Sequence, residues 1–507
     1  MHLKLENLAA LPSGVLKPNY SRRDLSQGIV HIGLGNFHRA HQAWYLHRLM
    51  QDNQALDWAV LGAGVRCEDA NRRIKMLKQD CLTTLIELAP SGKAVEVVGS
   101  MIDYIPVLNN NAALITKMAQ KSIRIVSLTV TEGGYFQTGL GMFDKDHADI
   151  QYDTAHPNTP KTAFGAMIAA LQIRKDTQAG PFTCLSCDNL QSNGQVLSQT
   201  ILGLARLSSP DLAEWIEQNV TFPNSMVDCI VPATGPAELE LVQSFGIDDS
   251  LPVTHENFRQ WVIEDKFCAG RPELEKVGVT FTDNVHNFEA MKLRLLNAGH
   301  QLIAAPAELL SIRTISDAMY HPLIAQLFRK IETEEIVPHV SAVPGMTPLS
   351  YVNLIAERFA NPEIRDTTRR VAFDGSARHP GFVHPVLRDA IAQNMPLDGL
   401  ALGEALWARM CAGWREDGTM IESNDPSWEN LVMQARIAKD SPAEWRRQYQ
   451  LYGDLGREIQ FGKRFDKWLH LIWSQGTEKA IQTYLDCLLY TSPSPRDATL
   501  SRMPSSA

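Results

Sequence analysis

Residues 31–44 of this chain read HIGLGNFHRAHQAW and join a strand candidate to a helix candidate. The short apolar run at 28–32 favours a strand, and the pattern at 40–52 favours a helix. Gly33 and Gly35 stand between them, where a tight bend lets backbone N–H groups approach a phosphate at the start of a helix. As the first turn between a strand and a helix, this stretch favours dinucleotide binding over a purely structural bend.

The fingerprint of this turn is incomplete. The third glycine of the common G-x-G-x-x-G pattern is replaced by His38, so a structural turn remains the alternative interpretation. In the dinucleotide interpretation, four residues of the turn contact the cofactor: Gly33, Gly35, Asn36 and Phe37.

Strand-type runs alternate with helical patterns between about residues 28 and 189, a rhythm typical of βαβ units with a parallel sheet. After about Phe288 the chain changes to long helical stretches. The sequence therefore predicts an α/β fold, with a Rossmann-like NAD-binding domain over 1–286 and a mostly α-helical substrate domain over 287–486. Further strand candidates are 57–61, 123–131 and 181–186, and the helix candidates are 289–310, 322–335, 349–359, 400–414 and 442–452.

An acidic pair, Glu68 and Asp69, follows the strand candidate at 57–61. An acidic residue at this place binds the hydroxyl groups of an adenosine ribose. It also repels a 2′-phosphate, which predicts NAD rather than NADP as the cofactor. Three neighbouring arginines weaken this preference: Arg66, Arg72 and Arg73. A solvated loop of mixed charge is the alternative interpretation.

The predicted helix at 289–310 carries the residue types of a proton-transfer site. At about 100° per residue, four polar side chains fall within a sector roughly 140° wide: Glu289, Lys292, Asn297 and His300. A lysine among leucines on a part-buried face loses solvation, which lowers its pKa toward the range of a general base. An amide and an imidazole nearby can hold the oxygen of an alcohol or ketone. Spacing alone fits an ordinary amphipathic helix equally well.

The composition is that of a globular, acidic chain. Of its 507 residues 44% are hydrophobic, and 48 basic against 57 acidic residues give a formal net charge of −9. This composition excludes a largely disordered chain. The absence of a basic tract argues against nucleic acid or an anionic membrane as a partner. No apolar run approaches the roughly 18–20 residues of a membrane span.

The eight cysteines are scattered along the chain, which favours the reducing cytoplasm. Cys184 and Cys187 have the spacing of a redox or metal motif, but no second Cys or Cys/His pair follows at zinc-site spacing. We therefore expect neither a redox role nor a metal, and an activity that EDTA leaves intact.

The last stretch, residues 487–507, reads CLLYTSPSPRDATLSRMPSSA and has no hydrophobic periodicity. A disordered tail is one interpretation. The stretch also resembles the translation of a sequencing adapter joined to a truncated gene, so we expect a non-native segment that follows Asp486. Deleting it should leave the melting temperature and the activity unchanged. A fall of several degrees in thermal unfolding would show instead that it docks on the fold.

Seven motifs occur in a fixed order along the chain: 31–44, SLTVTEGGY (127–135), SCDN (186–189), FPNSMVD (222–228), WVIEDKFCAGRP (261–272), the helix at 289–300 and Asp-Gly-Ser (374–376). Together they resemble the polyol-specific long-chain dehydrogenases, whose members act on mannitol, D-arabinitol or hexuronates. The resemblance extends over about residues 20–480, and seven ordered matches make a chance agreement negligible.

The resemblance implies a zinc-independent NAD(P) dehydrogenase and a role for each matching residue. Lys292 matches the catalytic base of a K-x4-N-x2-H pattern, in which Asn297 and His300 bind the reacting oxygen. Asn189 matches a second amide donor to that oxygen. Glu132 and Glu289 match carboxylates that link the lysine's proton to solvent. The contacts to the other hydroxyls of the substrate match Asp228 and Arg370.

Three departures from the family pattern bear on the substrate more than on the reaction. The chain has Asn297-Ala-Gly-His300 where the family usually has Asn-Gly-Ser-His. Cys229 stands where an arginine usually follows Val-Asp, and Arg378 stands where a lysine is common. An arginine binds hydroxyls or a carboxylate through a planar fork, unlike the point charge of a lysine.

We expect a reversible, NAD-dependent oxidation of a secondary hydroxyl, D-mannitol to D-fructose. Gly133 in TEGGY resembles the mannitol branch, since lysine commonly takes this position in the uronate reductases, and the run at 66–69 points the same way. D-Arabinitol oxidation and hexuronate reduction are alternative activities. A catalytically inactive nucleotide-binding protein is the alternative from another class. The expected partner is a small polyol or ketose, and the oligomeric state stays open.

Overall fold

The computed structural model describes residues 1–108, 110–138 and 141–487, without the side chains of Cys67 and Glu132. The expected non-native tail, from residue 488 on, lies outside the described residues. The chain forms two compact units. The N-terminal unit is Met1–Ala290 with Asn361–Ile364, and the C-terminal unit is Met291–Ala360 with Arg365–Ala507. The predicted boundary between the two domains, between residues 286 and 287, falls inside helix α10 (Val285–Met291).

The N-terminal unit is built on a five-stranded parallel sheet, which confirms the predicted α/β fold. Its strand order is β6-β3-β2-β7-β8, so the chain winds outward from β2 in one direction and then adds β7 on the other side of β2. A sheet of this order opens a crevice at its carboxyl edge where the order reverses. The strands are β2 (Gln27–Ile32), β3 (Ala59–Ala63), β6 (Met101–Tyr104), β7 (Ile125–Leu128) and β8 (Thr183–Ser186).

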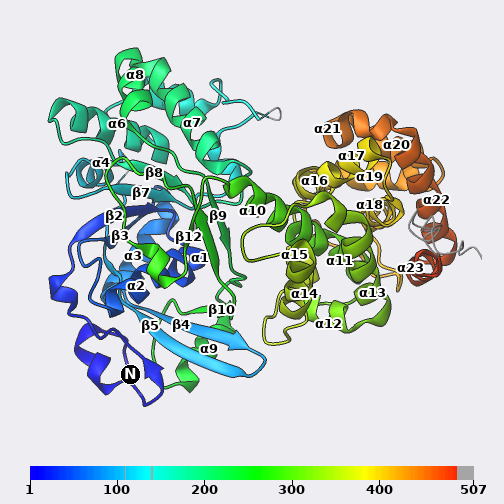
Figure 1. Ribbon diagram of the computed structural model, residues 1–507, viewed down its shortest axis with the longest axis horizontal. Coiled ribbons are helices and arrows are strands. Elements are labelled where there is room, and N and C mark those ends of the chain that lie inside the picture. The colour runs from blue at the N-terminus through cyan, green and yellow to red at the C-terminus, as the bar shows by residue number, and fades with distance from the viewer. Residues whose placement is uncertain (109, 139–140, 488–507) are drawn as a thin grey trace, which may run out of the picture. The chain divides into compact units, whose positions relative to one another are not determined.

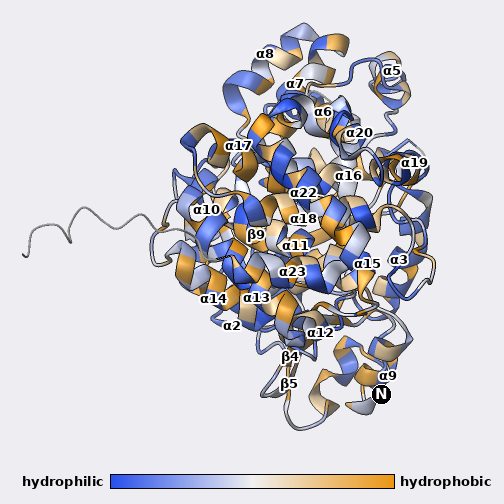
Figure 2. Cartoon of the chain, turned by 90° about the vertical axis from the view of Figure 1, so that its right-hand side faces the viewer, coloured by the Kyte–Doolittle hydropathy of each residue, from blue (hydrophilic) through white to orange (hydrophobic). Residues whose placement is uncertain are grey.

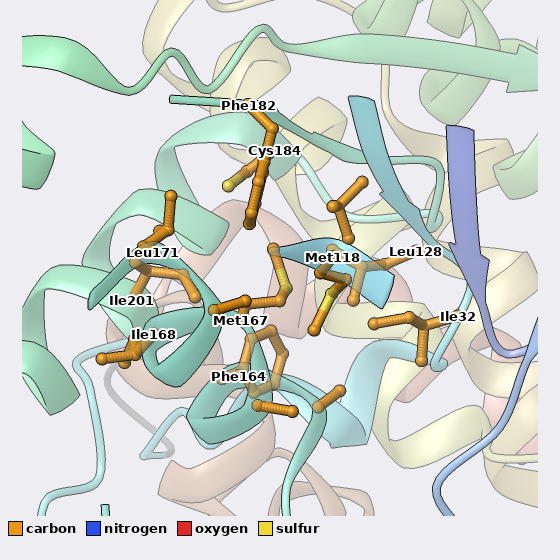
Figure 3. Close-up of a cluster of buried hydrophobic side chains, with 14 of the residues drawn as sticks. Ile32, Met118, Leu128, Phe164, Met167, Ile168, Leu171, Phe182, Cys184 and Ile201 are labelled. Carbon is orange, nitrogen blue, oxygen red and sulfur yellow. The ribbon is translucent and has the colours of Figure 1, made fainter. Parts of the chain in front are cut away.

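Both faces of this sheet are buried, because successive side chains of a strand point to opposite sides. Val30 and Ile32 belong to one hydrophobic cluster and Ile29 to another. Figure 3 shows the first cluster, where Ile32 and Leu128 of the strands lie near Phe164 of a covering helix. The helices of this unit are α1 (Asn36–Ala40), α2 (Gln42–Gln51), α3 (Cys67–Lys78), α4 (Ala112–Met118), α5 (Ala148–Ala155), α6 (Ala163–Asp176), α7 (Asn193–Ser208), α8 (Pro210–Asn219) and α9 (Pro236–Ser244) (Figure 1).

Two smaller sheets, which were not predicted from the sequence, accompany the parallel sheet. The first is ordered β1-β5-β4-β10 around an antiparallel hairpin, and the second is ordered β12-β11-β9. The strands are β1 (Val15–Leu16), β4 (Thr83–Ala89), β5 (Gly92–Val98), β9 (Ser225–Asp228), β10 (Val253–Glu256), β11 (Gln260–Ile263) and β12 (Thr280–Phe281).

The C-terminal unit is helical, as predicted. Four of the five predicted helices are confirmed with shifted ends, but the helix predicted at 442–452 is wrong, because it divides at Arg447 and Gln448 into two short helices. Its helices are α11 (Ala298–Leu309), α12 (Ile315–Tyr320), α13 (Pro322–Ile331), α14 (Pro348–Phe359), α15 (Thr368–Val371), α16 (Gly375–Arg378), α17 (His384–Gln393), α18 (Asp398–Met410), α19 (Trp428–Ala438), α20 (Pro442–Arg446), α21 (Tyr449–Tyr452), α22 (Ile459–Gln475) and α23 (Thr477–Asp486).

The core of the C-terminal unit forms around α11 and α18, whose residues are almost all buried. The outer helices are amphipathic and pack on them, and Figure 2 shows hydrophilic and hydrophobic residues alternating along these helices. Within the described residues no helix is long and apolar enough to cross a membrane.

Candidate functional site

The glycine turn between β2 and α1 has a backbone that only glycine fits. Gly33 has φ = +91°, and a Cβ atom there would come within 2.1 Å of the backbone oxygen of Thr129. The Thr129 hydroxyl also donates a hydrogen bond to the Gly33 carbonyl at 2.8 Å. The turn from β2 is therefore packed directly on the end of the neighbouring strand β7.

This turn borders a cleft of about 650 Å³ in the N-terminal unit. The cleft lies at the carboxyl ends of β2, β3 and β7, the place where the strand order reverses. Its lining includes Gly33, Gly35 and Asp69, and the loop after β7. A Cβ atom on Gly133 in that loop would meet nothing within 4 Å, so the loop leaves room beside its backbone. Position, volume and glycine content suit a dinucleotide.

The predicted cofactor residues divide into two groups. Gly33, Gly35 and Asp69 line the cleft, whereas three others are not among its lining residues: Asn36, Phe37 and Glu68. The amide of Asn36 donates instead to the backbone oxygen of Pro232 and the hydroxyl of Thr234. Phe37 stacks on His41 with ring centroids 4.8 Å apart. Glu68 is exposed on the first turn of α3.

Asp69 is buried and has two partners that the sequence analysis did not assign. One carboxylate oxygen accepts the backbone N–H of Arg66 at 3.1 Å, which caps the start of α3. The other accepts from the guanidinium of Arg72 at 2.9 Å. Arg66 and Arg72 also line the cleft, so its acidic residue is flanked by two basic ones.

The loop after β7 is held by Asp188, which the sequence analysis passed over in favour of Asn189 beside it. The Asp188 carboxylate accepts the backbone N–H groups of Val130 and Thr131 at 3.0 Å each, and the hydroxyl of Tyr135 at 2.6 Å. Thr131 has φ = +70°, which is strained for a β-branched residue. Asp188 thus fixes the backbone that leads into Glu132, whose side chain lies outside the described residues. Asn189 itself is exposed.

The helix predicted at 289–310 is confirmed, but its pitch changes at the predicted site. A π-helical turn spans Lys292–Asn297, between α10 and α11. Its hydrogen bonds join residues five apart, so Lys292 and Asn297 lie about one turn from each other. An α-helix would separate them by about 140° around its axis. The assumption of a uniform α-helical pitch is therefore wrong here, and the π turn brings the two side chains onto one side.

His300 follows on α11 with a nitrogen that is ready for a ligand. Its ring stacks on Phe359 with centroids 3.9 Å apart, and its buried Nε2 has no hydrogen-bond partner among the described residues. Burial lowers the pKa of His300 to about 3, a shift that Asp366 opposes and nearby arginines reinforce. The imidazole is therefore neutral at physiological pH. Lys292, in the same unit, is also buried.

The glycine at residue 299, one of the two departures between Asn297 and His300, has a structural reason. A Cβ atom on Gly299 would lie 2.7 Å from Oε1 of Glu332 and 2.8 Å from the ring of Phe328. Glu332 is completely buried, and burial raises the pKa of its carboxyl well above the usual range. Glycine at this position accommodates the buried acid without moving the helix that carries Asn297 and His300.

Glu289 lies on α10 in the N-terminal unit and has the environment of a proton carrier. One of its oxygens faces Nδ1 of the half-exposed His286 at 3.2 Å and accepts the Ser192 N–H at 3.3 Å. Burial raises the pKa of Glu289, and the contacts with His286 and Ser192 only partly offset that effect. Its other oxygen is buried without a partner among the described residues.

Two of the residues predicted to contact the substrate, Arg370 and Arg378, form hydrogen bonds within the protein. Arg370 donates from Nε and Nη2 to the two carboxylate oxygens of Asp366, at 2.6 and 2.5 Å. Arg378 donates to the backbone oxygen of Val371 at 2.7 Å. In the N-terminal unit, Asp228 is the buried last residue of β9.

In the part of the chain that the structure describes, no group of three or more His, Cys, Asp or Glu side chains is placed to hold a metal ion. Cys184 and Cys187 are both buried free thiols. Burial raises the pKa of each thiol, which disfavours the reactive thiolate.

Comparison with known families matches nearly the whole chain. Residues 27–276 match the family model described as the mannitol dehydrogenase Rossmann domain, and residues 284–473 match the mannitol dehydrogenase C-terminal domain. Among characterised relatives, the chain is 52% identical to mannitol 2-dehydrogenase of Cereibacter sphaeroides, over 93% of this chain and 99% of that one. It is 38% identical to mannitol 2-dehydrogenase of Aspergillus clavatus, over 94% and 97% of the two chains.

Two solved structures resemble the whole fold. Mannitol 2-dehydrogenase of Pseudomonas fluorescens, in a ternary complex with NAD and D-mannitol, superposes with a TM-score of 0.88 at 38% identity, covering 96% of this chain and 99% of that one. A D-sorbitol dehydrogenase in substrate-free form superposes with a TM-score of 0.85 at 34% identity, covering 95% and 100%.

Proposed function

The chain belongs to the mannitol dehydrogenase family, and we propose on that basis that it is an NAD-dependent polyol dehydrogenase of the mannitol 2-dehydrogenase type, interconverting D-mannitol and D-fructose. The observation that carries the proposal is the catalytic helix of the C-terminal unit. There a π turn spans Lys292–Asn297 and includes the buried Lys292, and among the described residues the buried Nε2 of His300 on α11 has no hydrogen-bond partner. These residue types suit proton transfer from a hydroxyl.

The N-terminal cleft supports NAD as the cofactor. Gly33 and Gly35 border it, so the cofactor's pyrophosphate can approach the backbone without meeting a side chain. Asp69, on the first turn of α3 after β3, lines the cleft, which supports its assignment to the adenosine ribose. When bound, the nicotinamide accepts a hydride from the substrate carbon.

In the proposed reaction, Lys292 enters as the neutral amine, the form that burial favours. Its Nζ takes the proton of the reacting hydroxyl as the carbon–hydrogen bond breaks, leaving a ketone and an ammonium group. The Asn297 amide and the His300 imidazole donate hydrogen bonds to the reacting oxygen, and the negative charge that develops there is stabilised by such fixed donors. Asn189 is assigned as a further amide donor by the family resemblance.

We assign the return of the lysine's proton to solvent to Glu132 and Glu289. The environment of Glu289 supports this role, because burial raises the pKa of the carboxyl above its ordinary range and so brings it closer to that of a proton carrier. The partly exposed His286 beside it offers a route to water. We further assign Asp228, Arg370 and Arg378 to the remaining hydroxyls of the substrate.

The scattered cysteines support a cytoplasmic location. The substrate is a small polyol or ketose, and nothing in the charge of the chain calls for nucleic acid or a membrane as a partner.

The substrate proposal is tested by assaying ketose reduction with NADH at neutral pH. We expect kcat/KM for D-fructose to exceed that for D-fructuronate by at least about tenfold, or ~1.4 kcal/mol of transition-state discrimination. The reason is that Asp366 already neutralises the charge of Arg370 and occupies its Nε–Nη2 edge. Faster reduction of fructuronate would place the chain with the hexuronate reductases. If D-arabinitol or D-sorbitol were oxidised faster than D-mannitol, the assigned substrate would change, but the assigned reaction type would not.

Coenzyme choice is tested by Asp69→Ala. Removing this carboxylate from the cleft removes its repulsion of a 2′-phosphate and frees Arg72 to bind one. We expect the ratio of kcat/KM with NADP to that with NAD to rise by about tenfold or more. Glu68→Ala is the matched control, because its exposed carboxylate is not among the cleft-lining residues, and its ratio should not move. A shift of equal size in both variants would remove Asp69 from the ribose site.

A further inference from the structure

We propose that Asp366 determines substrate specificity by occupying Arg370, so that the site selects neutral polyols and ketoses over anionic ones. This inference rests on the proposed function and adds to it a residue that selects by charge. Asp366 is a specificity residue acting through Arg370, and it has no part in the transfer of the proton or the hydride.

The geometry of the pair supports this role. Asp366 is 4% exposed, whereas the Arg370 side chain is 52% exposed. Both carboxylate oxygens of Asp366 accept from Arg370, one from Nε and one from Nη2. This is the side-on, two-pronged arrangement with which arginine binds a carboxylate. The buried acid therefore occupies the Nε–Nη2 edge of Arg370 and neutralises its charge, so that the remaining N–H groups on Nη1 and Nη2 donate to neutral hydroxyls without a net positive charge to attract an anion.

The pair lies close to the predicted oxygen-binding residue. Asp366 and Arg370 both act electrostatically on the His300 ring, with opposite signs. Two further arginines, Arg358 and Arg378, also act on this ring, so Asp366 is the acidic member of a group with three basic members. Replacing the Asp366 carboxylate with an amide would add a full positive charge to the surroundings of His300 and release the Arg370 edge.

A buried acid–arginine pair can also be purely structural, and the chain offers a matched example. Arg446 donates from Nε and Nη2 to the two oxygens of Asp466, at 3.0 and 2.9 Å, in the same unit. Asp466 is not among the charged groups that act on His300. The two pairs share the two-pronged geometry but differ in location and burial, since in the second pair the arginine is the more buried partner and Asp466 is 37% exposed. Asp466→Asn therefore controls for the loss of a paired carboxylate away from His300.

The test compares Asp366→Asn with the wild-type enzyme and with Asp466→Asn. The measured quantity is the ratio of kcat/KM for D-fructuronate to that for D-fructose, with NADH at neutral pH. We expect this ratio to rise at least about tenfold in Asp366→Asn, mainly through a lower KM for fructuronate, because two unit charges at contact distance interact by several kcal/mol in partly polar surroundings. The ratio should not change in Asp466→Asn.

A second pair of variants separates the charge effect from a folding defect. Arg370→Gln alone should lower the ratio, since it leaves the Asp366 carboxylate facing an anionic substrate. In the double variant Asp366→Asn/Arg370→Gln the gain should disappear. The inference is overturned if folded Asp366→Asn keeps the wild-type ratio, or if the gain persists without Arg370. If Asp366→Asn does not fold, an unchanged ratio in Arg370→Gln overturns it. The wild-type enzyme reports separately on the proposed function: a preference for fructuronate in that enzyme counts against the proposed function and not against the role of Asp366.

Discussion

Replacing Lys292 with alanine is expected to reduce kcat for D-mannitol oxidation by about 10³–10⁴-fold, at the upper end of what a positioned general base contributes. The buried amine takes the hydroxyl proton in the proposed reaction, and neither Asn297 nor His300 can replace it. An amide does not accept a proton at neutral pH, and burial lowers the pKa of His300 to about 3. NADH binding, measured by fluorescence titration, should be nearly unchanged, because Lys292 is not part of the N-terminal cleft.

Two controls make this test specific to the amine. Lys292→Met keeps most of the side-chain volume and should lose as much activity as Lys292→Ala. Lys330→Ala removes a lysine of the same unit that pairs with Glu334, and turnover should stay near wild type. Small primary amines added to Lys292→Ala should restore part of the rate, with more basic amines restoring more. Turnover of Lys292→Ala within tenfold of wild type would remove the lysine from the mechanism.

The parallel sheet and its glycine turn could be predicted because their signals are local. Four of its five strands overlap a predicted apolar run, and the turn residues Gly33 and Gly35 adjoin one of them. The fifth, β6, is four residues long and contains Asp103, and it was not predicted. The hairpin β4–β5 was missed although its signal is also local. Two strand-like runs at 83–89 and 92–98 adjoin Pro90, Ser91 and Gly92, a combination typical of a hairpin.

The catalytic helix could be located from the sequence, but its pitch could not. The pattern of leucines around Lys292 fits an α-helix, and no residue type marks the switch to hydrogen bonds five residues apart. The sequence also has no residue type that marks the break between α20 and α21. Gln448 leaves the helical region with ψ = 86° although no glycine or proline stands at residues 447–448. Such features depend on packing against other helices, which a single sequence does not display.

In the candidate site, too, residues within a local sequence pattern could be predicted, whereas residues with partners far along the chain could not. Lys292, Asn297 and His300 were identified because they match a pattern within one helix. Asp188 was passed over because its partners lie more than 50 residues away, on the loop after β7. The Asp366–Arg370 pair was missed although the sequence carried its signal, since an acid four residues before an arginine can pair with it on one helical face.

The loss of Glu404 is expected to have the largest effect on stability. This completely buried residue of α18 faces two imidazoles, His379 at 2.7 Å and His384 at 3.2 Å, and accepts the hydroxyl of Tyr452 at 2.7 Å. Burial alone would raise the pKa of Glu404, but the two imidazoles outweigh it and hold that pKa well below its usual range. Glu404→Ala should therefore lower the free energy of unfolding by about 3–5 kcal/mol, the usual cost of breaking a buried ion pair.

The pH dependence identifies the cause of that loss. A carboxyl whose pKa is lowered by folding contributes stability above its ordinary pKa of 4.5, and the contribution falls as pH drops through its lower folded value. Urea unfolding should thus show a large difference between wild type and Glu404→Gln at pH 7, and a clearly smaller one at pH 3, since the contribution is lost only between 4.5 and the lowered folded pKa. Glu444→Ala, which breaks the exposed pair with Arg447, should cost less than about 1 kcal/mol at either pH. If the loss in Glu404→Gln were the same at both pH values, the charge of Glu404 would not be what stabilises the helices around it, and its shape alone would account for the effect.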